Sequence, residues 1–133
     1  MKIAYISHAE VAAIYQDLKD NGYHEWYITL KIIDEMQIDY TFLSKLTWGQ
    51  LLDNDVITNT SGKADKNYLV TPELKKEIYT IFNIIKIENY DEKIVTTTVD
   101  SLYRYLLQTY EPIKKYKENG GVFRIDCFRE YSI

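Results

Sequence analysis

The side chains that most often carry catalysis occur in this sequence without the spacings that catalysis needs. His8 and His24 lie at the two ends of the first predicted helix and its loop, and neither belongs to a metal-binding pattern such as H-E-x-x-H. The residues at 61–63, Ser-Gly-Lys, resemble the last part of a phosphate-binding loop motif. However, Ile57 stands at the position where that motif needs its first glycine. Cys127 falls in the apolar phase of a predicted strand, which is typical of a buried structural thiol. We therefore predict no catalytic residue, no metal ligand, no cofactor and no enzymatic activity.

Basic side chains gather in two stretches that are candidates for contact with a nucleic-acid backbone. The first stretch surrounds a predicted hairpin and consists of Lys63, Lys66, Lys75 and Lys76. The second lies near the end of the sequence and consists of Lys114, Lys115, Lys117 and Arg124, interleaved with Tyr110, Tyr116 and Phe123. Alternating basic and aromatic side chains suit contacts to single strands and phosphates. For the second stretch, a solvated helix face beside a core strand stays open as an alternative.

Acidic side chains dominate the first part of the chain. Residues 1–60 hold four basic and nine acidic side chains. This part should avoid phosphates, which repel carboxylates, and should be available to a basic partner protein. We take four residues as candidate protein contacts, namely Asp34, Glu35, Asp39 and the aromatic Trp48.

The composition is that of one folded domain. The chain has 133 residues and a formal net charge of −4, with 46% hydrophobic and 27% charged residues. The longest stretch without a charged residue, 78–85, is far shorter than the roughly 20 apolar residues that a membrane-spanning helix needs. We therefore expect a cytoplasmic protein without a membrane partner. The 13 tyrosines reflect either codon bias or a contact surface.

Helices are well marked in the first third of the sequence. Ser7 and Glu10 form a capping box, and Asn21-Gly22 supplies a stop, which together predict a helix from about residue 8 to residue 21. The 3.6-residue periodicity of 25–37 predicts a second helix, whose apolar arc excludes Tyr27. That arc consists of Trp26, Leu30, Ile32, Ile33 and Met36.

The rest of the chain reads as short helices, a hairpin, and longer helices. A second capping box, Thr47 to Gln50, opens a short helix after one or two turns at 41–46. Two β-prone runs at 56–60 and 67–71 predict a hairpin, and Thr71-Pro72 opens the next helix. A polar connection follows at 86–93, and then a helix from about 98 to 110. After a break at Pro112, we predict a short helix and a terminal strand with alternating apolar residues. We predict an α+β fold in two parts, a helical domain with a hairpin over residues 1–90 and a helix-helix-strand extension over 91–133 packed on the same core.

This order of elements resembles the winged helix-turn-helix family. The segment LLDNDVITNTSGKADKNYLVTPELKKEI looks like the end of a recognition helix, the wing and the following helix of such domains. Val70-Thr71-Pro72 is similar to the family's wing-to-helix junction, and the resemblance covers roughly residues 25–86. It implies a winged-helix-like core and a DNA-binding or regulatory role.

We therefore predict a non-enzymatic binding protein, with DNA as the first partner. The alternative is a small acidic inhibitor of the phage type, hence a viral or mobile-element protein, that binds a basic host protein and occupies its nucleic-acid site. A third hypothesis is a structural subunit of a larger assembly, in which the unpaired edge of the terminal strand adds to another sheet. A homodimer is also open.

Overall fold

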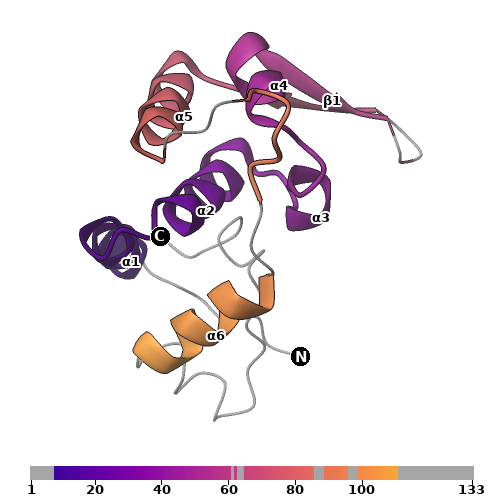
Figure 1. Ribbon diagram of the computed structural model, residues 1–133. Helices are drawn as coiled ribbons and strands as arrows, with labels where there is room; N and C mark the ends of the chain where they lie inside the picture. Colours follow the sequence, from indigo (N-terminus) through magenta and orange to yellow (C-terminus); the bar gives the residue numbers. More distant parts are fainter. Residues whose placement is uncertain (1–7, 61, 63–64, 86–88, 96–98, 111–133) are drawn as a thin grey trace.

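The structure is a computed structural model, and it describes residues 8–60, 62, 65–85, 89–95 and 99–110. Over this part the protein is mainly helical with one two-stranded antiparallel sheet, which confirms the α+β class (Figure 1). The elements are α1 (His8–Asp20), α2 (His24–Met36), α3 (Tyr40–Leu43), α4 (Trp48–Asp53), β1 (Val56–Asn59), β2 (Lys66–Leu69), α5 (Pro72–Ile84) and α6 (Val99–Thr109). Ser7 of the first predicted capping box lies outside the described residues, as do the predicted break at Pro112, the predicted short helix and the predicted terminal strand.

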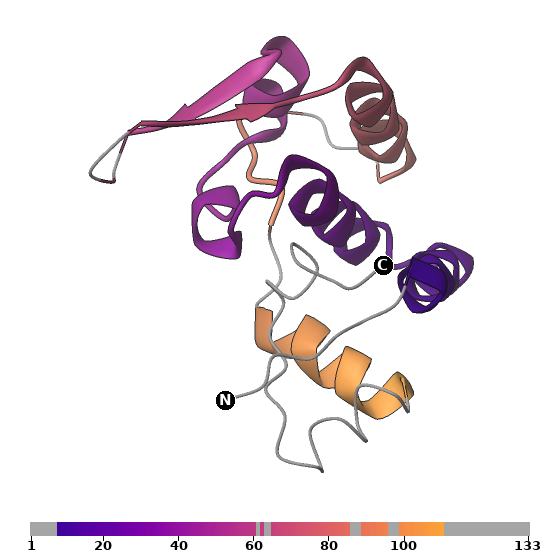
Figure 2. The same cartoon turned by 180° about the vertical axis from the view of Figure 1, so that it is seen from behind.

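α2 is the central helix, with α1 and α5 packed against it (Figures 1 and 2). Helices on more than one side bury more of its circumference than the single arc that periodicity predicts. Tyr27, expected on the polar side, is only 3% exposed, because it lies between α1 and α5. Its hydroxyl donates a hydrogen bond to Glu77 of α5, and its ring meets the ring of Tyr15 of α1 edge to face. The expected polar position is therefore corrected to a core position.

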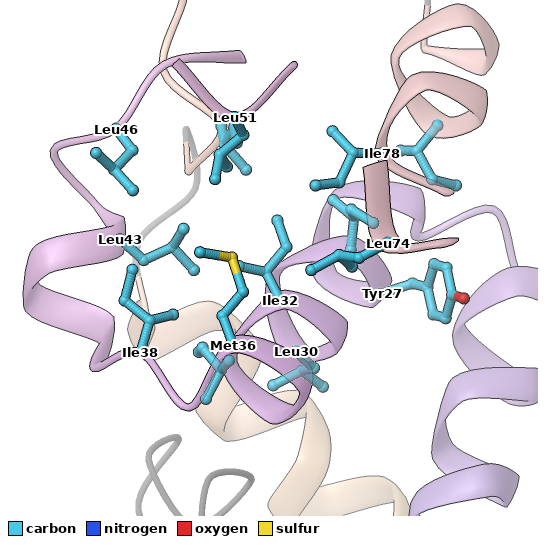
Figure 3. Packing of buried hydrophobic residues seen from close by; sticks show 14 of the residues in the cluster. Tyr27, Leu30, Ile32, Met36, Ile38, Leu43, Leu46, Leu51, Leu74 and Ile78 are labelled. Atoms are coloured by element: carbon cyan, nitrogen blue, oxygen red, sulfur yellow. The ribbon is translucent and has the colours of Figure 1, made fainter. Parts of the chain in front are cut away.

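The core continues from α2 into the short helices and α5. Figure 3 shows Met36 and Ile32 of α2 facing Leu43 and Leu51 on one side and Leu74 and Ile78 of α5 on another. The same cluster of buried side chains includes Leu102 and Leu106 of α6. The helix at 99–109 thus shares one hydrophobic core with the elements that precede it.

The hairpin has one buried and one exposed face. Ile57 pairs with Tyr68 across the strands, and both side chains are buried, with the Tyr68 ring 5.7 Å from the ring of Phe42. Val56 pairs with Leu69, and these two side chains are exposed. Both views show the strands extending beyond the helices (Figures 1 and 2). The predicted hairpin, and the helix opened by Thr71 as N-cap and Pro72, are confirmed.

The connection after α5, described at 89–95, is hydrogen-bonded to the beginning of α4. The predicted capping box is present: the Thr47 amide donates to the Gln50 side chain, and the Gln50 amide donates to the Thr47 hydroxyl. Thr47 also forms an isolated antiparallel bridge with Lys93, and Ile94 next to it is fully buried. The sequence suggests that the polar segment after α5 only connects two helices. In the structure, this segment packs against α4.

No helix in the described part of the chain is both long enough and apolar enough to span a membrane.

Candidate functional site

The basic residues near the hairpin are brought into one region, but they are not equivalent. Lys66 on β2 and Lys76 on α5 are exposed. Lys75 is held in an ion pair, with its ammonium 2.5 Å from the carboxylate of Asp55, the residue directly before β1. Among the residues of this region that the structure describes, Lys66 and Lys76 are therefore the exposed cations left for a phosphate backbone. The remaining predicted nucleic-acid contacts, Lys63, Lys114, Lys115, Lys117 and Arg124, lie outside the described residues.

The amide groups at the beginning of α4 are occupied by the chain itself. The Trp48 amide donates to the carbonyl of Glu92 at 3.1 Å, and the Gly49 amide donates to the carbonyl of Tyr90 at 2.8 Å. A Cβ at Gly49 would lie 3.2 Å from the Tyr90 Cβ, so glycine allows this close approach. Anion binding at a helix N-terminus needs amides that point at the ligand. Since these amides are used, α4 has no such site.

The predicted acidic contact residues are engaged within the fold. Asp34 accepts a hydrogen bond from the Tyr15 hydroxyl at 2.9 Å, and Glu35 forms an ion pair with Lys31 at 2.9 Å. Asp39 caps α3 by accepting from the Phe42 amide at 2.7 Å. Each carboxylate thus has a local structural role in addition to any contact with a partner.

Trp48 is corrected from a contact residue to a core residue. Its side chain has no exposed surface, and its ring lies 5.6 Å from the buried ring of Phe82. The capping box places Trp48 at the first position of α4, where the sequence suggested an exposed aromatic. The connection at 89–94 covers this position, and a capping motif carries no signal of such a long-range contact.

A shallow hollow of about 460 Å³ lies between α4 and α5. Its walls are formed by Leu52, Asp53, Pro72, Lys75, Lys76, Tyr79 and Tyr90. Tyr79 and Tyr90 are 51% and 41% exposed, and both rings contact Phe82. Sequence reasoning missed this site, because Tyr90 comes from the connection after α5. The only available signal was the general abundance of tyrosine.

A second aromatic cluster joins α6 to α1 through one carboxylate. Asp17 accepts hydrogen bonds from the Tyr110 hydroxyl at 2.6 Å and from the Tyr105 hydroxyl at 2.8 Å. These hydrogen bonds, with a smaller contribution from Asn21, hold the pKa of Asp17 below its usual value. Burial and the bond to Asp17 raise the pKa of Tyr105 to about 12 and raise that of Tyr110 as well.

Replacing Asp17 with asparagine should lower the free energy of unfolding by about 1 kcal/mol at neutral pH, because charge-assisted hydrogen bonds are lost. The native pKa of Asp17 is depressed, so this contribution is present above the carboxyl's unfolded pKa and is lost as the pH falls through its native pKa. Urea unfolding at a series of pH values should therefore show the wild-type and Asp17→Asn curves converging in acid. Asp20→Asn, on the exposed side of the same helix, is the control. A difference between wild type and Asp17→Asn that is independent of pH would contradict this account.

Comparison with known proteins identifies no relative: no family model, no curated protein and no solved structure matches the chain. In the part that the structure describes, no group of three or more histidine, cysteine, aspartate or glutamate side chains is placed to hold a metal ion.

Proposed function

We propose that this protein is a non-enzymatic DNA-binding module of the winged-helix type that contacts the duplex mainly through its hairpin. The observation that carries this proposal is the protruding β1–β2 hairpin, which follows α2, α3 and α4 in the chain and leads directly into α5 (Figure 2). This chain order, α2, α3, α4, hairpin, α5, is the order expected of a helix-turn-helix with a wing. Lys66 on β2 and Lys76 on α5 supply exposed positive charge for phosphates.

The contribution of α4 should be small. In a winged helix-turn-helix, the helix that precedes the wing reads bases in the major groove. Here α4 has only six residues, its first amides are used by the connection after α5, and its exposed side includes Asp53. We therefore infer contacts to the backbone more than to bases, and hence weak sequence preference.

Overall charge supports the same inference. The full chain holds 20 acidic and 16 basic side chains and has a formal net charge of −4, so its net charge does not attract DNA from a distance. Binding should then depend on a few local contacts and should be detectable mainly at low salt.

Replacing Lys66 and Lys76 together with alanine tests this proposal. Each lysine that contacts a phosphate contributes about 0.9 to the slope of log affinity against log salt, so the slope should shrink by about 2. Affinity should fall similarly for unrelated duplex sequences, as measured by fluorescence anisotropy over a salt series. Arg104→Ala removes an exposed cation from α6, at the opposite end of the molecule from the hairpin, and should bind like wild type (Figure 1). Absence of DNA binding at low salt, or an unchanged slope in the double variant, would contradict the proposal.

A protein partner is the second candidate, and the exposed face of the hairpin favours it. Val56 and Leu69 form a cross-strand pair and are 49% and 61% exposed. Contiguous exposed apolar surface marks protein interaction sites, and this pair would form part of such a surface. A regulatory role, an origin in a virus or mobile element, inhibition of a host protein and homodimer formation all stay predictions.

A further inference from the structure

We propose that the hollow between α4 and α5 binds one unpaired nucleotide of a DNA strand, where a single strand continues from a duplex. This inference rests on the proposed DNA-binding function and names a substrate feature that the hairpin alone would not recognise. The hollow combines exposed aromatic rings, a cation and a carboxylate, and each suits a different part of a nucleotide.

The aromatic rings are held from behind and exposed toward solvent. The Tyr79 ring stacks on Phe82, with centroids 6.5 Å apart and planes at 20°, and the Tyr90 ring meets Phe82 edge to face at 5.0 Å. Phe82 is itself fixed against the fully buried Trp48. Side chains supported in this way lose little freedom when a ligand binds. Every base has a flat face that can stack on such a ring, whatever its identity.

The charged groups at the rim distinguish a nucleotide from a purely apolar ligand. Lys76 is exposed and lines the hollow, where its ammonium can contact a phosphate. Asp53 lines the same hollow with an exposed carboxylate, which can accept a hydrogen bond from the amino group of a base.

The hollow lies next to the base of the hairpin. Lys75, which lines the hollow, forms its ion pair with Asp55 directly before β1. The Val70 amide, directly after β2, donates to the carbonyl of the same Asp55 at 2.8 Å. A strand that leaves a duplex bound along the hairpin would therefore reach the hollow without crossing the core.

The test compares a blunt DNA duplex with the same duplex carrying a short single-stranded extension, in which the first unpaired base is the fluorescent analogue 2-aminopurine. Wild type should bind the junction about fivefold or more tightly than the blunt duplex, because stacking of one base is added. Its binding should also quench the fluorescence of the analogue. Tyr79→Ala should lose both effects and bind both probes equally, whereas Tyr79→Phe should retain them. Asn83→Ala, an exposed change on α5 outside the hollow, is the matched control.

The outcomes separate the two proposals. Equal wild-type affinity for the two probes would overturn the nucleotide site while leaving DNA binding by the hairpin intact. A junction preference that survives in Tyr79→Ala would also overturn it. Absence of binding to either probe at low salt would overturn the proposed function and this inference with it. Lys76→Gln is a second variant that leaves the ring contacts unchanged. It should weaken binding to both probes and lower the salt slope by about 1, while the junction preference and the quenching remain.

Discussion

Trp48→Ala should lower the free energy of unfolding by about 3–5 kcal/mol, the usual cost of truncating a large buried aromatic side chain. Trp48 has no exposed surface and packs against Phe82, so its loss leaves a cavity between α4 and α5. Phe82 in turn supports Tyr79 and Tyr90, so the hollow should lose its shape in the same variant.

Chemical denaturation followed by circular dichroism measures this effect. Asp53→Ala, an exposed change on the same short helix, should shift the free energy by no more than about 0.5 kcal/mol. Trp48→Phe should fall between the two, because it retains an aromatic ring. If Trp48→Ala unfolds at the same denaturant concentration as wild type, Trp48 does not lie in the core, and its earlier assignment as a surface contact would regain support.

Leu106→Ala should lower the free energy of unfolding by about 2–5 kcal/mol. Leu106 on α6 is fully buried and belongs to the same cluster of side chains as the residues of α1 and α2. Since this core is shared, the whole loss should appear as a shift of one cooperative transition. Gln108→Ala changes an exposed position on the same helix and should have little effect.

Differential scanning calorimetry together with circular dichroism tests the cooperativity. Two separate unfolding transitions, of which Leu106→Ala shifts only the one at lower temperature, would show that α6 unfolds independently of the rest of the molecule. In that case the helix after residue 98 would form a separate folding unit, and its contacts with Asp17 would contribute little to the stability of the core.

Local signals in the sequence were sufficient to predict most secondary structure. The helices at 8–20 and 24–36 follow from the 3.6-residue spacing of apolar side chains, and the first of them ends at the predicted Asn21-Gly22 stop. The capping box at Thr47 and the Thr71-Pro72 start act through neighbouring amides, so a few residues determine them. The hairpin follows from two β-prone runs around a polar loop.

The candidate site in the hollow was harder to predict from the sequence, because its residues come from segments that are far apart in the chain. Lys75 and Lys76 were found as basic residues, but the ion pair that occupies Lys75 joins it to Asp55, 20 positions away. Tyr90 reaches the hollow from a connection that composition marks as polar and exposed. Composition describes such a segment correctly on average and still does not indicate which of its residues packs against a helix.

Within the described residues, the sequence by itself therefore determined the type and approximate position of the helices and the two strands, since caps, stops and periodicity act within one or two turns. Only the tertiary structure decided what surrounds each element. Tyr27 is buried because α2 is covered by both α1 and α5, and Trp48 is buried because the chain returns after α5 to cover α4. Burial depends on contacts between residues far apart in the chain, and a local pattern reports only on the face of the element that carries it.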